Sequence, residues 1–450
     1  MNTTDRESVK VAAVVSSPAR LPASIQRRIF IYLGILIVLL ALGAPFGGLF
    51  DIPISFLLKN KLDLDAEELA FFRLMAAIPL YFSFVFGFIR DIWNPFGMTD
   101  RGKMVLFGTV CSALYVLSAF TAISYSSLLA AIILVTTSFL FVASSQNGLT
   151  SMIAQRNRMS GRISAAWNIF LTVPTLVAFL IGGHLSNLLE RQNADQAARI
   201  LFFVGAATMA LVALYATWKP KSVFDKIDFE PRESTHPLHD LKRLLRHWPI
   251  YPALLIWLLW NFAPGSVTPL QYYLQNTLNS DDAQWGQWNA IFSASFIPTF
   301  VLFGALCRKV PLKSLLLWGT IVAIPQLVPL LLINSVTGAL VAAVPIGLMG
   351  GVATAAYIDL IIRSSPRGFE GTTLMSSVAL NWMAVRFGDV LGANLYIHYG
   401  GFTTCVFASM IVYALIIPIL LLVPNHLIAS ADGQMPTSAI ELADEAPSSS

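Results

Sequence analysis

Long uninterrupted apolar runs are the feature that most constrains this chain. The first covers about residues 29–50, and stretches of roughly 20 residues recur afterwards, the length with which an α-helix crosses a ~30 Å hydrocarbon core. Charged residues make up 12% of the chain and the mean hydropathy is +0.68, whereas about a quarter of the residues of a soluble protein are charged. The sequence therefore predicts an all-α membrane protein with many spans.

Twelve such runs can be counted. They lie near residues 29–50, 70–89, 104–124, 128–150, 164–185, 199–218, 249–270, 287–307, 312–333, 337–362, 372–396 and 401–424. The first is longer than the core of a cleaved signal peptide, about 7 to 15 residues, so we expect it to be retained as a span. An even number of spans predicts that both termini lie on the same side.

The distribution of Lys and Arg predicts which side this is. The loops on the side of the N-terminus hold most of these residues: Arg90, Arg101, Lys103, Arg156, Arg158, Arg162, Arg308, Lys309, Lys313, Arg363 and Arg367. The opposite loops hold Lys59, Lys61, Arg191 and Arg199. By the positive-inside bias, both termini are expected in the cytoplasm, and we expect a multi-pass protein of a bacterial inner (plasma) membrane.

A polar segment, residues 219–247, divides the runs six and six. We therefore expect a cytoplasmic N-terminal segment (1–28), a six-helix bundle (29–218), a cytoplasmic linker (219–247), a second six-helix bundle (248–424) and a disordered cytoplasmic tail (425–450), whose composition is too polar to fold. The pattern L-x-N-x-L-x-x-D begins at Leu58 and again at Leu274. Such matches indicate two parallel repeats, with the substrate path between them.

One short segment, residues 87–103, is unusually charged for this chain. It places Arg90, Asp91, Asp100, Arg101 and Lys103 between two apolar runs. We expect these charges to lie in water, in the first cytoplasmic loop.

The same segment carries a resemblance to a known family. The spacing of Gly87 and Asp91 resembles the G-x-x-x-D loop motif of the major facilitator superfamily, and Pro95-Phe96-Gly97 followed by Arg101 resembles its folate-biopterin transporter branch. Further similar stretches are Phe56-Leu57-Leu58-Lys59, Trp260-Asn261-Phe262-Ala263-Pro264 and Pro366-Arg367-Gly368-Phe369-Glu370-Gly371-Thr372. That branch carries acids in its fourth span, where this chain has Ser144-Ser145-Gln146-Asn147-Gly148.

The resemblance implies a twelve-helix transporter that works by alternating access. It also implies that Asp91 braces a cytoplasmic helix end and a nearby Arg while the inner gate is closed. The expected gating residues are Gly87, Arg90, Asp91, Gly97 and Arg101.

Two charges within the eleventh run are candidate pathway residues. Arg386 and Asp389 are expensive to insert into a membrane, at roughly 2.5 to 3.5 kcal/mol each, and such residues are by default functional candidates. Three residues apart, they lie on one helix face and can pair. One interpretation is that Arg386 binds substrate while Asp389 takes up protons; the other is a fixed structural pair.

Neutral polar residues in the runs give weaker candidates. Those that could line a polar cavity are Gln146, Asn147, Asn261, Gln271 and Asn381, together with Trp260. Polar residues also join membrane helices to one another. Asn261 gains support from the Pro264 break beside it, because interrupted helices free backbone groups near binding sites.

The overall interpretation is a secondary transporter of a small organic solute, driven by protons or another coupling ion. We expect a monomer in the lipid bilayer, with no nucleic-acid partner, no cofactor and no metal. Cys111, Cys307 and Cys405 lack the spacing of a metal site. Two alternative hypotheses are a membrane-embedded enzyme and a non-transporting membrane receptor. The enzyme would need clustered histidines or acids.

Overall fold

The computed structural model describes residues 22–63, 72–92, 98–189, 192–220, 242, 244–280, 282–366 and 368–433, and the elements within these ranges are all helices. The first half of the chain forms α2 (Ala23–Gly43), α3 (Gly48–Lys61), α5 (Ile78–Tyr81), α6 (Ser83–Ile92), α7 (Asp100–Ser118), α8 (Tyr125–Arg156), α9 (Ser160–Leu189) and α10 (Ala194–Thr217). The first helix thus begins inside the segment 1–28 that was expected to precede it.

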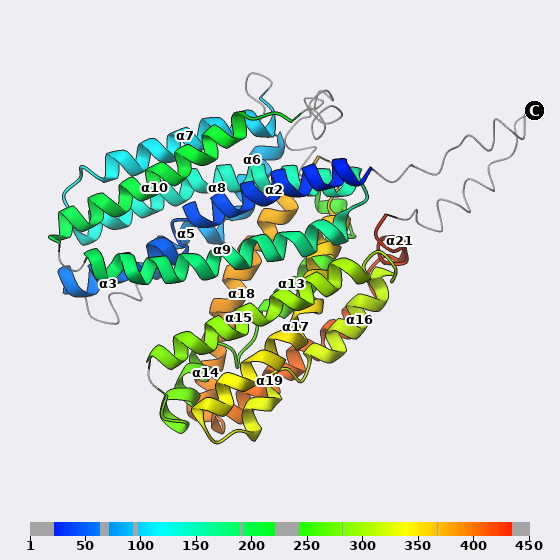
Figure 1. Ribbon diagram of the computed structural model, residues 1–450. Coiled ribbons are helices and arrows are strands. Elements are labelled where there is room, and N and C mark those ends of the chain that lie inside the picture. The colour runs from blue at the N-terminus through cyan, green and yellow to red at the C-terminus, as the bar shows by residue number, and fades with distance from the viewer. Residues whose placement is uncertain are drawn as a thin grey trace, which may run out of the picture.

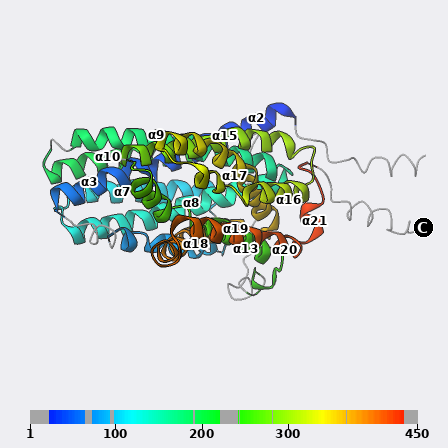
Figure 2. The ribbon, with the colours of Figure 1, turned by 90° about the horizontal axis from the view of Figure 1, so that it is seen from below.

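The second half forms α13 (Ile250–Asn261), α14 (Thr268–Tyr272), a π-helix (Tyr273–Thr277), α15 (Asp282–Leu306), α16 (Leu312–Ala323), a 3₁₀-helix (Val328–Leu332), α17 (Val336–Ser364), α18 (Glu370–His398), α19 (Gly401–Ala414), α20 (Ile416–Leu420) and α21 (Asn425–Ile428). Most of the expected linker, 219–247, lies outside the described residues. Figures 1 and 2 show the long helices of the first half running side by side, whereas α18 of the second half runs steeply across them in Figure 1 and is seen nearly end-on in Figure 2.

Seven stretches in the described residues are long and apolar enough to cross a membrane: Ala23–Asp51, Tyr125–Arg156, Asp195–Thr217, Gln284–Leu306, Leu312–Leu332, Val336–Ser364 and Gly401–Leu420. Other runs counted in the sequence are divided in the structure. The second run contains the separate helices α5 and α6, and the seventh contains α13, which ends at Asn261.

Each half opens with a broken helix, at Ala44-Pro45 and at Ala263-Pro264, of which the second was expected. α2 ends at Gly43 and α3 begins at Gly48, around Pro45; α13 ends before Pro264 and α14 begins at Thr268. Proline lacks the N–H that continues a helix, and the residue before it avoids the helical conformation. The breaks leave polar backbone groups inside the bundle.

The two halves meet along a narrow set of helices. α18 packs against α5, α6 and α8, while α15 and α17 pack against α9. In Figure 1 the ribbons of the halves lie close together on the side of α21 and separate towards the side of α3 and α14. We refer to these two sides as the α21 end and the α3 end.

The C-terminal segment that follows the last long helix is folded onto the α21 end. Residues 425–433 were expected to belong to a disordered tail, which is wrong because Ile428, Ala431 and Asp432 are buried. Asp432 accepts hydrogen bonds from Gly161 N and Arg162 Nε in the first half, at 3.2 and 2.7 Å, and its own N–H donates to Cys307 O in the second half. Residues 434–450 lie outside the described part of the chain.

Substituting Gly87 tests the closeness of the two halves. A Cβ at this position would lie 2.6 Å from Gly371 O and 2.7 Å from Thr372 Cα, and backbone atoms cannot move aside as a flexible side chain can. We expect Gly87→Val to lower the free energy of unfolding by about 1–3 kcal/mol, measured as a lower apparent Tm of the purified protein. Gly286→Ala is the matched control, since a Cβ there meets nothing within 4 Å. Equal melting of both variants would contradict this account of the contact.

Candidate functional site

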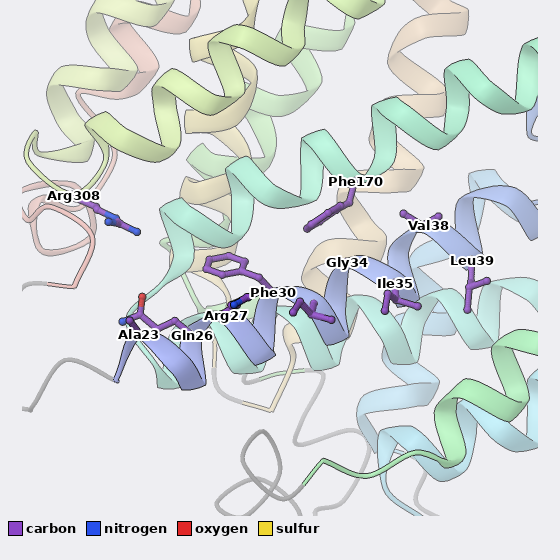
Figure 3. A pocket seen from close by; sticks show the side chains of 11 residues that line it. Ala23, Gln26, Arg27, Phe30, Gly34, Ile35, Val38, Leu39, Phe170 and Arg308 are labelled. Atoms are coloured by element: carbon purple, nitrogen blue, oxygen red, sulfur yellow. The ribbon is translucent and has the colours of Figure 1, made fainter.

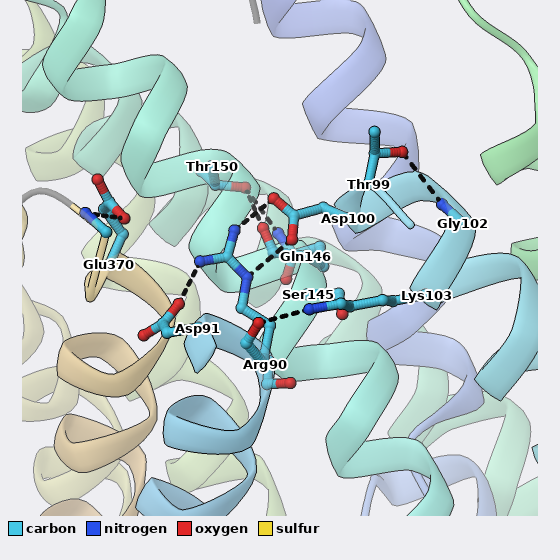
Figure 4. A network of polar contacts seen from close by, with 12 residues as sticks. Arg90, Asp91, Thr99, Asp100, Gly102, Lys103, Ser145, Gln146, Thr150 and Glu370 are labelled. Carbon is cyan, nitrogen blue, oxygen red and sulfur yellow. Dashed lines mark hydrogen bonds and ion pairs between the residues drawn. The ribbon is translucent and has the colours of Figure 1, made fainter. Parts of the chain in front are cut away.

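The centre of the interface at the α21 end is the buried guanidinium of Arg90, at the end of α6. Its exposed fraction is 0%, and it lies between two carboxylates: Nε donates to Asp100 Oδ1 at 2.8 Å, and the other nitrogens donate to Asp91 and Asp100 (Figure 4). Gly148 of α8 faces the guanidinium, leaving no room for a side chain. An unpaired charge here would cost several kcal/mol, so the two acids are what permits Arg90 to be buried.

Asp91 extends this network to the second half. Its Oδ2 accepts hydrogen bonds from Thr372 N at 2.7 Å and Thr372 Oγ1 at 2.6 Å, in the first turn of α18. The first N–H groups of a helix have no partner within the helix and favour a negative charge. One carboxylate thus binds Arg90 of its own half and the start of a helix from the other half.

The expectation that the charges of residues 87–103 lie in water is wrong for Arg90, Asp91, Asp100 and Lys103, which are all buried. They are buried because α8 and α18 cover the end of α6, and Lys103 Nζ satisfies the carbonyl of Arg90 at 2.5 Å. Arg101 instead links α7 to α10, because its Nη2 donates a hydrogen bond to Thr217 O at 2.6 Å. Gly97 lies outside the described residues.

Further hydrogen bonds join the halves near the same end. Gln155 Nε2 donates to Ile362 O and Ser365 O, at 2.5 and 2.8 Å. Ser164 Oγ donates to Ala355 O at 2.6 Å, and Ser83 Oγ donates to Met375 O at 2.9 Å. These side chains bind backbone carbonyls of α17, α18 and the turn between them, so the α21 end is closed by polar contacts in addition to packing.

An aromatic cluster lies between the halves near the middle of the long helices. Phe46, at the α2–α3 break, contacts Phe139 of α8 and Trp382 of α18, with ring centroids 5.5 and 5.8 Å apart. Tyr81 packs in the same cluster, and its buried hydroxyl has no hydrogen-bond partner in the described part of the chain. The half-buried Asn381 precedes Trp382 in α18. The cluster thus combines aromatic rings of both halves with one buried hydroxyl group.

Charges from both halves face each other towards the α3 end. Arg73 Nη2 lies 3.4 Å from Asp51 Oδ2, and the two side chains are 46% and 45% exposed. The positive charge of the exposed Arg386, in α18, also acts on the Asp51 carboxylate. Because these groups are exposed or half exposed, solvent screens their charges, and we expect them to hold this end less firmly than the buried contacts hold the α21 end.

Asp389 does not pair with Arg386, as the spacing of three residues had suggested. Its two carboxylate oxygens accept hydrogen bonds from Thr268 N and Thr268 Oγ1, at 2.8 and 2.9 Å, and the ion pairs among the described residues do not include Arg386. The break after α13 brings the start of α14 beside α18, and an N–H group that lacks a helical partner is available there. Asp389 therefore binds the short helix α14 within its own half.

The other predicted pathway residues do not share one cavity. Trp260 packs on Tyr357 and Tyr413 in the core of the second half. Asn261 Nδ2 donates to Trp257 O within α13, at 2.8 Å, and Gln271 is a half-buried residue of α14.

The two candidates from α8 lie at the interface between the halves. Gln146 lies beside Arg90 and Asp100 in Figure 4, with its Nε2 bound to Thr150 at 3.0 Å. Asn147 Nδ2 lies 3.2 Å from Met375 Sδ of α18. Both amides therefore belong to the closed part of the interface.

Sequence reasoning missed several residues that the fold brings to the interface. Phe46, Tyr81 and Trp382 look like ordinary apolar residues of membrane spans, and Thr372 and Gln155 lie at helix ends. To predict the contacts of these residues, one must know which helices of the two halves are neighbours.

Comparison with known proteins identifies the family. The family model of the Major Facilitator Superfamily matches residues 101–393. The chain belongs to the major facilitator superfamily. A search of curated protein sequences found no match for the chain.

Solved structures share the fold at low identity. The proton:xylose symporter XylE, bound to 6-bromo-6-deoxy-D-glucose, is 13% identical, with a TM-score of 0.63, covering 92% of this chain and 98% of that one. The transporter FucP in the outward conformation is 13% identical, with a TM-score of 0.67 and coverage of 88% and 98%. A bacterial homologue of the iron transporter ferroportin, in an outward-facing state, is 15% identical, with a TM-score of 0.64 and coverage of 87% and 98%.

Asp91→Asn tests whether this carboxylate holds the two halves together. The substitution removes one of the two carboxylates that bind Arg90 and weakens the bonds to Thr372, so we expect a loss of about 1–3 kcal/mol in the free energy of unfolding. Spin labels on cysteines introduced at the exposed Thr217 and Lys313, one in each half, should report a longer distance at the α21 end. The native cysteines are buried, which limits their labelling.

Asp195→Asn is the control for this variant, because Asp195 accepts a hydrogen bond from Ile123 N within the first half, at 3.1 Å. It should leave the distance unchanged. The role assigned to Asp91 would be wrong if its variant gave the same distance distribution as this control.

Proposed function

We propose that this protein is a secondary active transporter that moves a small organic solute by alternating access, using the proton gradient. The observation that carries the proposal is the asymmetry of the interface between the halves. Buried hydrogen bonds and the ion pair of Arg162 with Asp432 join them at the α21 end, whereas exposed and half-exposed charges face each other towards the α3 end. Such a molecule can expose its middle to one side of a membrane and then, after rocking, to the other.

The proposal includes twelve spans with both termini in the cytoplasm. The basic residues Arg90, Lys103, Arg162 and Arg363 gather at the α21 end, and the positive-inside bias assigns this end to the cytoplasm. The arrangement described above is then the state closed to the cytoplasm. The monomeric state and the bacterial inner membrane remain predictions.

The proposed solute site is the aromatic cluster of Phe46, Tyr81 and Trp382 with the neighbouring Asn381. The cluster includes residues of both halves, so a solute bound there would contact both and respond to their relative position. The unpartnered Tyr81 hydroxyl and the amide of Asn381 favour a solute with hydrogen-bonding groups and a flat or apolar face, such as a sugar or a heterocycle. The loops that resemble folate-biopterin transporters add pteridines to the candidates.

The proposed switch to the other state exchanges one set of contacts for another. The bonds from Asp91 to Thr372 and from Gln155 to the backbone around Ile362 would break, while Arg386 would approach Asp51 and Arg73. Exposed ion pairs contribute about 0–1 kcal/mol, so the solute would have to supply part of the difference through its own contacts in the second state.

Distance measurements at both ends test alternating access directly. Spin labels at the exposed residues Thr121 and His398 report on the α3 end, and the pair at Thr217 and Lys313 reports on the α21 end. A thermal-shift screen of sugars, pteridines, peptidoglycan fragments and organic acids supplies the ligand, since binding to the folded state raises the apparent Tm. We expect the ligand and a pH gradient to change the two distances in opposite directions. Distances that stay fixed, or change together, would exclude alternating access.

Asp389 is the proposed proton-binding residue, and it can act through α14. Protonation would remove the negative charge that Thr268 N and Oγ1 bind, which would free the start of α14. We expect Asp389→Asn to abolish proton-driven accumulation in proteoliposomes while leaving solute exchange intact.

Thr268→Ala is the matched control for the coupling role. It removes one hydrogen bond to the carboxylate but keeps the titratable group, so accumulation should still respond to the pH gradient. If Asp389→Asn accumulates solute at the full rate, or if both variants lose accumulation and exchange alike, Asp389 is a structural cap of α14 and carries no coupling.

A further inference from the structure

A groove on the flank of the molecule joins the two halves at the α21 end. It has a volume of about 590 Å³ and runs along α2, with Phe170 of α9 on its wall and Arg308, which follows α15, at its mouth. Figure 3 shows Arg27 and Arg308 at the same end of the groove, on ribbons of different halves, while apolar side chains follow α2 away from them. The groove lies outside the aromatic cluster and the network around Arg90.

The mouth of the groove carries two positive charges. Arg27 and Arg308 are exposed, and within the described ranges neither forms an ion pair or a side-chain hydrogen bond. Guanidinium groups bind phosphate oxygens in a fork of two parallel hydrogen bonds. Two such groups on one opening favour the binding of an anion.

Beyond Gln26 and the two arginines, the lining of the groove is apolar and follows one face of α2. Ile31 and Ile35 are 45% and 40% exposed, and Phe30, Val38 and Leu39 complete the wall. From Arg27 to Leu39 the helix rises ~18 Å, close to the ~15 Å depth of one leaflet of the hydrocarbon core. Gly34 keeps the groove deep, because its backbone approaches the ring of Phe170 so closely that a Cβ would lie 2.7 Å from it.

We propose that this groove binds an anionic phospholipid, with its phosphate between Arg27 and Arg308 and an acyl chain along α2. A free phosphate or nucleotide would use the arginines but leave the apolar wall unoccupied, whereas a zwitterionic lipid would leave the two positive charges uncompensated. Because the two arginines belong to different halves, the lipid stabilises the state in which the halves meet at the α21 end. The lipid is therefore a regulator of the conformational equilibrium that is separate from the transported solute.

Lipid titration of the purified full-length protein in neutral detergent tests the site. Phosphatidylglycerol should raise the apparent Tm in a saturable manner, while phosphatidylcholine with the same acyl chains should not. Arg27→Gln and Arg308→Gln should each raise the half-saturating concentration of phosphatidylglycerol. The double variant should raise it roughly tenfold or more. Arg28→Gln and Lys309→Gln are matched controls, since these exposed neighbours carry the same charge but do not line the groove.

A second measurement separates lipid binding in the groove from a nonspecific effect of the negatively charged lipid. Phosphatidylglycerol should shorten the Thr217–Lys313 spin-label distance, or narrow its distribution, in the wild type and in both controls but not in the double variant. An equal response of the double variant and the controls would overturn the proposal. The proposal would also be wrong if phosphatidylcholine raised the Tm as much as phosphatidylglycerol does. An equal Tm shift with inorganic phosphate or glycerol 3-phosphate would contradict it too, because it would indicate a site for a soluble anion.

Discussion

The buried Arg90 guanidinium is the group on which the observed arrangement of the halves depends. It has no contact with water and is neutralised by Asp91 and Asp100 of its own half. Of these acids, Asp91 also binds the first turn of α18. A charge in a low-dielectric environment stays there only while its partners stay, so the position of α18 and the burial of Arg90 are coupled. Two glycines, Gly148 and Gly371, provide the space that this requires.

The contacts around this centre explain why the interface is asymmetric. Polar side chains of α8 and α9 bind backbone carbonyls of the second half, and the folded segment after α20 contacts both halves through Asp432. Burial raises the pKa of Asp432, with Asp359 adding to the effect and Arg162 and Arg363 opposing it, as expected for a carboxyl held away from water. Towards the α3 end the facing charges are half exposed, and solvent screens them.

Much of the architecture could be predicted from residue type alone. The apolar runs predicted a helical membrane protein, Pro264 predicted a broken helix at the start of the second half, and Gly87 with Asp91 predicted the superfamily. The candidate site was predicted less well. Arg386 and Asp389 share a helix face but have different partners, because Thr268 approaches Asp389 from another helix. Trp260 and Gln146 were chosen for their chemistry, yet the first packs in a core and the second lies beside the Arg90 network.

The sequence by itself determined which parts of this protein avoid water, since hydrophobicity and helix-breaking prolines act locally and can be read one residue at a time. Only the tertiary structure decided which charged side chains are buried with these parts. Arg90, Asp91, Asp100 and Lys103 have the composition of a solvated loop. They are buried because they pair with one another and because helices from distant parts of the chain supply helix N–H groups and side-chain-free surfaces around them. The free energy of a charge depends on its partners and on its exclusion from water. Both depend on residues that are close in space, many of which are far apart in the sequence.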